Sequence, residues 1–234
     1  MKTFIIGDIH GCSRDFSALT ALLNPDPEKD RLILLGDLFD RGQDSWSVFQ
    51  AVRAMAEAFG GRFTLLRGNH EDYLRSEELS FWQKRMWDRV GRQATVRSFR
   101  SHGERMEDTV PWLKENCRLY YQDEHIRCVH AGVKVDPLEL NDVWTLVHDH
   151  CAVPENRYAG PLTVTGHIGL EWPAWFAGDG ETVELLPYGE DRPLPEQGVI
   201  CIDTGCGKGG PLTAMVVTGN QYRLERAMNT DQSS

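Results

Sequence analysis

Three short segments near the start of the chain carry carboxylate, imidazole and guanidinium groups at close spacing. They are GDIHG, with Asp8 and His10; GDLFDRG, with Asp37, Asp40 and Arg41; and RGNHE, with Arg67, Asn69 and His70. Alternate residues of an extended segment point to the same side, so the first two side chains can reach one ion. A single D-x-H is equally well explained as a turn with an incidental histidine. Three such segments together favour a metal site.

Each segment follows an apolar run that predicts a strand, over residues 2–7, 30–36 and 62–68. Between them, apolar residues at helical spacing predict helices over 13–23 and 45–59. Strands that alternate with helices indicate a parallel sheet. Sites in such sheets form beyond the carboxyl ends of the strands, so we expect the three loops to converge on one edge.

The remainder predicts a helical cap over residues 73–124 and then further strands within 125–130, 161–167, 198–203, 212–219 and 221–226. These strands predict a second, mixed or antiparallel sheet within a single domain of residues 1–225, followed by a flexible tail over 226–234. His130 and His167 end two of the strands and are candidate ligands. The other histidines lack this framing and are expected on the surface or the cap: His102, His125, His148 and His150.

Charge and composition exclude several classes of function. The 234 residues include 25 Lys and Arg against 35 Asp and Glu, a net charge of -10, with no basic block. This balance argues against a nucleic-acid partner. No apolar run resembles a signal peptide or reaches membrane-spanning length, so we expect a cytoplasmic protein without membrane contact. The six cysteines are then expected to be reduced thiols.

The residue types suit a site with two metal ions, which needs a bridging anion and open positions for substrate and water. Asp37 is the natural bridge. Asp8 and His10 would complete the first set of ligands, and Asn69 with histidines from later in the chain would hold the second ion. Mixed oxygen and imidazole donors favour Mn, Fe or Zn over Ca.

The ordered motifs GDIHG, GDLFDRG, RGNHE, HAG and GH resemble those of the calcineurin-like metallophosphoesterases. More narrowly, they resemble the phosphoprotein phosphatase family, above all its bacterial and phage members. The resemblance implies an α/β fold with a central β-sandwich of two mixed sheets flanked by helices. It also implies two divalent ions, with Mn²⁺ the first choice and Fe or Zn the alternatives, and a metal-bridging hydroxide that attacks the phosphoryl group directly and in line.

The same resemblance implies a role for each motif residue. Asp8, His10 and Asp37 would bind one metal ion. The ligands of the other would be Asp37, Asn69, His130 and His167. His70 would be the general acid, oriented by Asp40. Arg41 and Arg67 would hold the phosphate oxygens.

Two substrate classes remain open. The intact Asp40 and His70 favour a serine/threonine phosphatase, with dual specificity as an extension, acting on phosphorylated proteins or peptides. The segment DTGCGKGG, with Cys206 and Lys208, and Cys12 after the first motif resemble symmetrical diadenosine tetraphosphatases, which cleave a dinucleoside polyphosphate to ADP. A third hypothesis is a catalytically silent domain that binds a partner through its cap.

The chain also departs from the family pattern. Leu146 stands where phosphoprotein phosphatases commonly carry the Arg of a Trp-x-Arg motif, so Arg157, Lys134 or a cap residue would have to substitute. Trp172 and Trp175 follow the GH motif, where either pocket walls or core are conceivable, and we expect core.

Overall fold

The computed structural model describes residues 1–76 and 78–227. The first half alternates strands and helices in the order β1 (Thr3–Ile6), α1 (Ser13–Leu23), β2 (Arg31–Leu34), α2 (Ser45–Phe59), the 3-10 turn η1 (Gly60–Arg62) and β3 (Phe63–Leu66). Both helices have the predicted bounds. The start of α2 follows from local chemistry, since the Asp44 side chain accepts from the Ser47 N–H.

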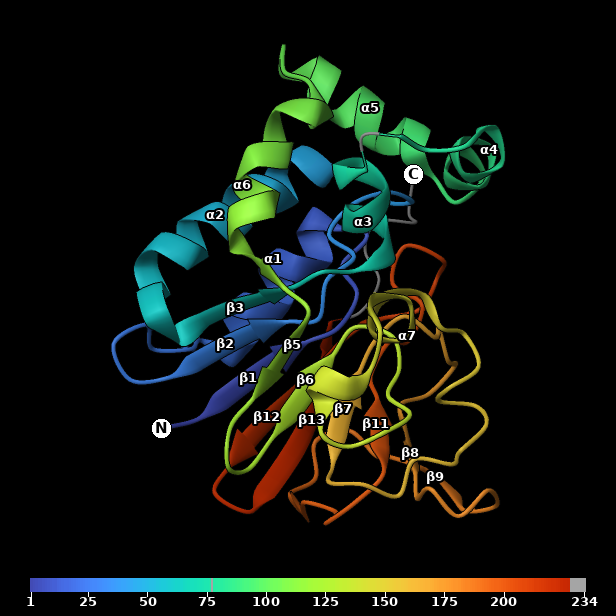
Figure 1. The fold of residues 1–234 in the computed structure, drawn as a ribbon. Coiled ribbons are helices and arrows are strands. Elements are labelled where there is room, and N and C mark those ends of the chain that lie inside the picture. The colour runs from blue at the N-terminus through green and yellow to red at the C-terminus, as the bar shows by residue number, and fades with distance from the viewer. Residues whose placement is uncertain (77, 228–234) are drawn as a thin grey trace.

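Two mixed sheets form a sandwich, as predicted (Figure 1). In the first, β1 to β3 and the short β4 (Cys117–Arg118) are parallel, and the antiparallel β12 (Leu212–Thr218), β13 (Gln221–Ala227) and β10 (Arg192–Pro193) extend it beyond β1. The second has the order β5 (Tyr120–Gln122), β6 (Arg127–Val129), β7 (Thr163–Thr165), β11 (Val199–Cys201), β8 (Ala174–Phe176) and β9 (Val183–Leu185). Here β6, β7 and β11 are parallel.

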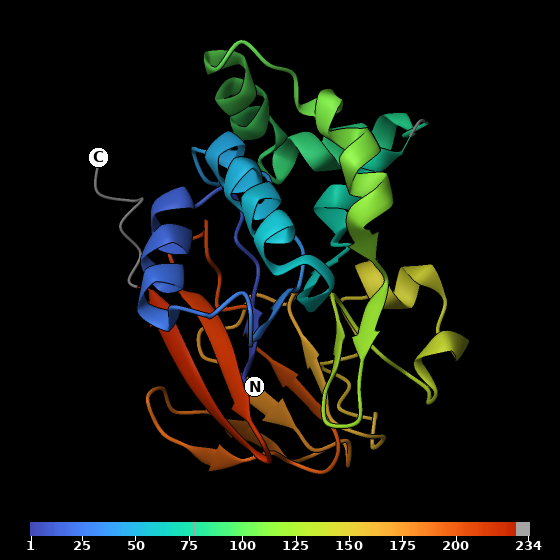
Figure 2. The ribbon, with the colours of Figure 1, turned by 90° about the vertical axis from the view of Figure 1, so that its left-hand side faces the viewer.

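Alternating strand residues divide the apolar core into layers. Ile5 and Ile33 of the first sheet pack with Val164 and Ile200 of the second, between the two sheets. The sequence neighbours of Ile5 and Ile33 point the other way, toward α1 and α2, which cover the outer face of the first sheet (Figure 2). Both faces of the parallel strands are therefore covered, which explains why these strands are continuously apolar.

The cap differs in part from the prediction. It contains α3 (Asn69–Arg75), α4 (Phe81–Arg89), α5 (Arg92–Ser101), the 3-10 turn η2 (Met106–Thr109) and α6 (Val110–Asn116). The helical prediction over 73–124 is wrong after 116, because Cys117 pairs with Leu65 of β3 and Tyr120 pairs with Val129 of β6. Long-range pairing thus decides the conformation of this stretch.

The remaining elements are η3 (Leu138–Leu140) and α7 (Val143–His148). The predicted tail overlaps β13, which continues through residues 226–227. Residues 228–234 lie outside the described residues.

Among the described residues, no helix combines the length and the apolar character that crossing a bilayer requires.

Candidate metal centre

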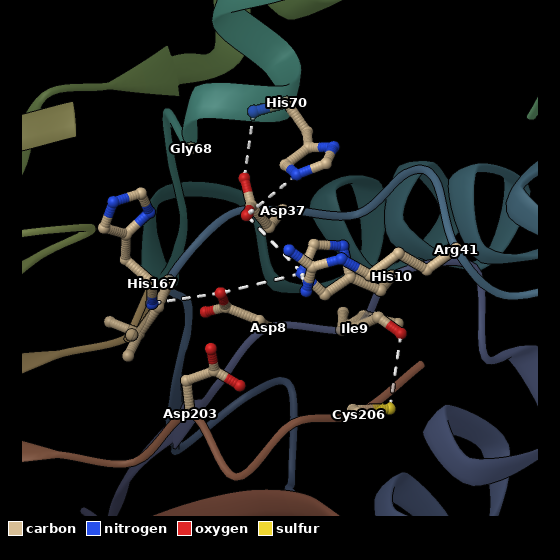
Figure 3. A network of polar contacts seen from close by, with 12 residues as sticks. Asp8, Ile9, His10, Asp37, Arg41, Gly68, His70, His167, Asp203 and Cys206 are labelled. Atoms are coloured by element: carbon tan, nitrogen blue, oxygen red, sulfur yellow. Dashed lines mark hydrogen bonds and ion pairs between the residues drawn. The ribbon is translucent and has the colours of Figure 1, made fainter. Parts of the chain in front are cut away.

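Loops that follow six strands meet at one edge of the sandwich. The loops after β1, β2 and β3 come from the first sheet, and those after β6, β7 and β11 come from the second. The strands of each set are parallel, so their carboxyl ends share an edge. Figure 3 shows side chains from both sheets around Asp37, including Asp8, His70 and His167.

The structure brings together the three residues predicted to hold the first metal ion. Nε2 of His10 lies 3.5 Å from a carboxylate oxygen of Asp37 and 3.9 Å from one of Asp8. All three side chains are buried. Burial raises the pKa of Asp8 well above its ordinary value, and the charges of Asp203 and Asp37 raise it further. A cation placed among these carboxylates would relieve their repulsion.

The residues predicted for the second ion also lie together, on the other side of Asp37. Oδ1 of Asn69 is 3.2 Å from Nε2 of His130 and 2.9 Å from Nδ1 of His167. Nε2 of His130 is 3.5 Å from Oδ1 of Asp37. Burial alone would raise the pKa of Asp37, but the imidazoles of His130, His70 and His10 outweigh it and hold this pKa far below its ordinary value.

Backbone carbonyls set the orientation of two histidine ligands. Nδ1 of His10 bonds to the Phe39 carbonyl at 2.9 Å, and Nδ1 of His130 bonds to the Leu35 carbonyl at 2.8 Å. Because a carbonyl only accepts, each Nδ1 carries the proton and each Nε2 presents its lone pair toward Asp37. Such anchoring of the distal nitrogen is the usual support of a metal-ligating histidine.

Several non-glycine residues of the site loops have a positive backbone φ. Of seven described non-glycine residues with positive φ, five belong to the predicted site: His10, Asp37, Asp40, Arg41 and His167. This conformation is costly for residues with a Cβ and concentrates where the surrounding structure imposes it for function.

Two glycines leave the space that the carboxylates occupy. A Cβ on Gly166 would lie 2.1 Å from Oδ1 of Asp8, and a Cβ on Gly68 would lie 2.2 Å from Oδ1 of Asp37. Both distances are far below van der Waals contact. The glycines of GH and RGNHE are therefore required by close packing against the ligands.

Buried polar atoms without partners supply a test of whether metal ions fit here. Oδ1 of Asp8 and Nε2 of His167 are buried and have no hydrogen-bond partner. Unsatisfied buried polar atoms are rare in folded proteins and call for an explanation. Both belong to predicted ligands within a buried cluster of carboxylate and imidazole donors, so the cluster is suited to metal ions. The donor set alone does not select the metal.

His70 and Asp40 form a buried pair beside this cluster. Nδ1 of His70 lies 2.5 Å from Oδ2 of Asp40, while Nε2 of His70 lies 3.8 Å from Asp37. Asp40 also accepts from Trp87 Nε1 at 2.6 Å and from the Thr95 hydroxyl at 2.7 Å. Burial alone would lower the pKa of His70, but Asp37 and Asp40 outweigh it and raise this pKa above its ordinary value.

A pocket of about 270 Å³ opens onto the cluster and is lined in part by Asn69, His70 and His167. Tyr73, Met86 and Val90 of the cap also line the pocket, as does Lys208. The cap therefore bounds the approach to the site.

The structure separates the two arginines predicted to bind phosphate. Arg41 lines the pocket and contacts Nε2 of His10. Arg67 pairs instead with Asp72, with its Nη1 at 3.3 Å from the carboxylate, and is not among the residues that line this pocket. The role of Arg67 in phosphate binding stays a prediction.

Two histidines expected on the surface or cap lie beside the site: His150 is exposed, as expected, whereas His148 is partly buried. His150 stacks on His167 with ring centroids 4.2 Å apart and lines the pocket. His148 bonds to Asp72 at 2.8 Å. Neither histidine lies between an apolar run and a glycine in the sequence. Instead, α7 and the turn after it bring them to this edge.

Sequence reasoning also missed residues that support the ligands. Asp203 is buried beside Asp8 in the loop after β11, where its place at a strand end was the available signal. Glu71 accepts from the backbone N–H groups of Gly68, Asp37 and Leu38. Burial, reinforced by the charge of Asp37, raises the pKa of Glu71 to about 7.

The two tryptophans after the GH motif differ from each other. Trp172 is 37% exposed, so the expectation that it belongs to the core is wrong. Its Nε1 donates to the Leu186 carbonyl, and its ring borders a surface groove with Leu170 and Leu185. Trp175 is half-buried against the core between the sheets.

The fold and the site define a metal-dependent phosphoesterase. The family model of the calcineurin-like phosphoesterases matches residues 1–221. The chain belongs to this family, and the resemblance seen in its motifs is confirmed.

The named relatives with similar sequences match only part of this chain. A symmetrical bis(5'-nucleosyl)-tetraphosphatase of Photorhabdus laumondii is 31% identical over 134 residues, which cover 57% of this chain and 45% of that protein. The corresponding protein of Glaesserella parasuis is 42% identical over 76 residues, 32% of this chain and 26% of that protein. The chain thus matches less than half the length of these relatives.

Solved structures share the fold at low identity. A metallophosphoesterase from Sphaerobacter thermophilus has a TM-score of 0.63 at 17% identity, covering 98% of this chain and 89% of that one. A protein serine/threonine phosphatase of Saccharomyces cerevisiae has a TM-score of 0.61 at 12% identity, covering 100% and 82%. A protein-tyrosine phosphatase of a Shewanella species has a TM-score of 0.56 at 12% identity, covering 97% and 80%.

Proposed function

We propose that this chain is a phosphomonoester hydrolase that removes phosphate from serine and threonine side chains of proteins, with phosphotyrosine as an additional substrate. The buried pair of His70 and Asp40 carries this proposal. A serine or threonine alkoxide is strongly basic and must be protonated as its bond to phosphorus breaks. An acid at this position is therefore most valuable for a phosphoprotein substrate.

The geometry indicates how His70 would act. Its Nδ1 faces Asp40, so Nε2 holds the other proton and faces the pocket and Asp37. Asp40 is fixed by Trp87 and Thr95 and favours the protonated imidazole. His70 would donate its Nε2 proton to the departing oxygen.

The ligands would hold two divalent ions, Mn²⁺ first and Fe or Zn as alternatives, in the sets Asp8, His10, Asp37 and Asp37, Asn69, His130, His167. When bound, such ions supply a nucleophile derived from water at neutral pH and offset phosphate charge. Arg41 would orient the phosphoryl oxygens from its place in the pocket. The cap residues Tyr73 and Met86 would limit access of bulk water.

Symmetrical cleavage of diadenosine tetraphosphate to ADP is the second candidate. The curated relatives carry that name, and Lys208 of the DTGCGKGG segment lines the pocket. ADP is a far weaker base than an alkoxide and leaves with less need of an acid. The pair of His70 and Asp40 therefore favours the phosphoprotein substrate.

The test compares three substrates with metal-stripped protein titrated with Mn²⁺. These are a phosphoserine peptide, diadenosine tetraphosphate and p-nitrophenyl phosphate. We expect Mn²⁺-dependent turnover with the highest kcat/KM on the peptide. ADP formation with an inert phosphopeptide would establish the second candidate instead. Absence of turnover on all three would support a silent binding domain.

A further inference from the structure

Besides the metal ions, which would offset part of the phosphate charge, cationic side chains of the protein would hold the phosphate oxygens. A phosphate monoester carries close to two negative charges near neutral pH. Arg41 is the motif arginine that lines the described pocket, whereas Arg67 pairs with Asp72. Leu146 stands where the family's additional arginine is expected, and it is buried in α7.

The substitutes suggested by the sequence lie elsewhere. Lys134 pairs with Asp149, and its ammonium lies 5.5 Å from the ring centroid of Trp144. Arg157 is exposed and is not among the residues that line this pocket. Neither can be read as a second cation of the site.

The glycine-rich loop after β11 carries a cation to the pocket. The N–H groups of Lys208 and Gly210 both donate to the Gly205 carbonyl, at 2.9 and 3.1 Å, which closes a tight turn. Gly207 has φ of 77°, and a Cβ there would lie 3.0 Å from Cβ of His10 and 3.1 Å from Cβ of Arg41. The backbone next to Lys208 is thus packed against two site residues.

The charge of Lys208 reaches the site and is not neutralised locally. Among the described residues, no carboxylate lies within ion-pair distance of its ammonium. Lys208 is exposed and lines the pocket, so its four-carbon stem can bring the ammonium over it.

We propose that Lys208 is the second cation of the phosphate-binding site and, with Arg41, contacts the oxygens of the phosphoryl group that is hydrolysed. The inference rests on the proposed phosphoester hydrolysis. Lys208, from the loop after β11, would take over the role of the arginine that is replaced by Leu146 in this chain. Because non-reacting oxygens keep their charge throughout the reaction, Lys208 would bind ground state and transition state alike, affecting KM more than kcat.

The test uses Mn²⁺-loaded protein and inorganic phosphate as the ligand, measured by calorimetry. Lys208→Gln removes the charge, Lys208→Arg keeps it, and Lys29→Gln is the control. Lys29 is an exposed lysine just before β2, at the opposite edge of the sheet from the site. A charged hydrogen bond lost from a binding site predicts about tenfold weaker phosphate binding for Lys208→Gln. We expect Lys208→Arg to bind within about threefold of the parent, and Lys29→Gln to be unchanged.

Kinetics on p-nitrophenyl phosphate and diadenosine tetraphosphate give a second readout. The proposal predicts a KM on p-nitrophenyl phosphate that rises by about the same factor as the phosphate Kd. Unchanged phosphate affinity in Lys208→Gln overturns the proposal. A loss confined to diadenosine tetraphosphate also overturns it and assigns Lys208 to a neighbouring phosphate.

The calorimetric comparison separates this inference from the proposed function. If the parent protein binds phosphate, Lys208→Gln weakens that binding and no substrate turns over, the inference stands while the proposed activity fails. If turnover is normal and Lys208→Gln binds phosphate like the parent, the activity stands while the inference fails. Circular dichroism of each variant shows that the fold is retained.

Discussion

Two groups of metal-ligating side chains lie near the loop that follows β1. One is the site, where Asp37 belongs to two sets of candidate ligands. His10 and His70 complete one set, and His130 and His167 complete the other. The other, which we call the thiol cluster, consists of Cys12, Asp15 and Cys206. Within each set of three residues, two sets sharing Asp37 in the site and one in the thiol cluster, the candidate ligand atoms lie within 4.8 Å of one another, and every residue is buried.

The two groups differ in what surrounds their ligand atoms. In the site, backbone carbonyls hold Nδ1 of His10 and His130, so each Nε2 faces Asp37, and a pocket gives access. In the thiol cluster, the contact with Cys12 and burial raise the pKa of Cys206 far above its ordinary value, which disfavours the thiolate that a metal needs.

The thiols instead support the neighbouring backbone. Sγ of Cys206 donates to the Ile9 carbonyl at 3.4 Å, and Sγ of Cys12 donates to the His10 carbonyl at 3.6 Å (Figure 3 shows the first contact). Ligand types at suitable distances are thus insufficient for a metal site. Oriented lone pairs and access distinguish the site from the thiol cluster, and substitutions can test this distinction.

The largest effect is expected for Asp37→Asn, because Asp37 faces both sets of ligands. Metal content after dialysis should fall, and turnover on p-nitrophenyl phosphate should drop by at least about a thousandfold, as several kcal/mol of charge stabilisation are lost. The exposed Asp108→Asn is the matched control and should keep both. Full occupancy by two ions in Asp37→Asn would contradict the bridging role.

His70→Asn should leave the metal content intact while removing the proposed acid. Turnover on the phosphoserine peptide should fall by about 10²–10⁴-fold. Turnover on p-nitrophenyl phosphate should fall much less, because its leaving group is weakly basic. His125→Asn, at an exposed histidine, is the control. Equal losses on both substrates would argue against an acid role for His70.

Gly166→Ala tests the packing of the ligands without removing one. The new Cβ would meet Oδ1 of Asp8 at 2.1 Å, so Asp8 must move. We expect about 10- to 100-fold weaker Mn²⁺ retention, measured by competition with a chelator, with the helical circular dichroism signal preserved. Gly61→Ala, where a Cβ meets nothing within 4 Å, should behave as the parent protein. Parent-like retention in Gly166→Ala would show that Asp8 is not held by this contact.

The smallest effect is expected in the thiol cluster. Cys12→Ala and Cys206→Ala should keep two ions per chain and lower the free energy of unfolding by about 1 kcal/mol, measured in urea. The exposed Cys151→Ala should change it by less than about 0.5 kcal/mol. Loss of a metal ion from either buried variant would make the thiol cluster a second metal site.

Elements stabilised by contacts close in the sequence were predicted better than elements that depend on contacts far apart in the chain. The bounds of α1 and α2 matched the sequence pattern, because capping and apolar spacing act within a few residues. The strands β4 and β5 were missed because they form only through pairing with strands distant in the sequence. His150 was missed for the same reason, because no local motif marks its place beside the site, whereas Asp203 stood at the end of a predicted strand.

The sequence by itself determined which chemical groups follow the strands and that these strands are parallel, so that the groups meet at one edge. These groups belong to Asp8, His10, Asp37, Asn69 and His70. Only the tertiary structure decided how the second sheet completes the site. Pairing of β11 between β7 and β8 brings Asp203 and Lys208 to that edge, and burial raises the pKa of Asp203. Contacts between residues far apart in the chain leave no local pattern, so packing had to decide them.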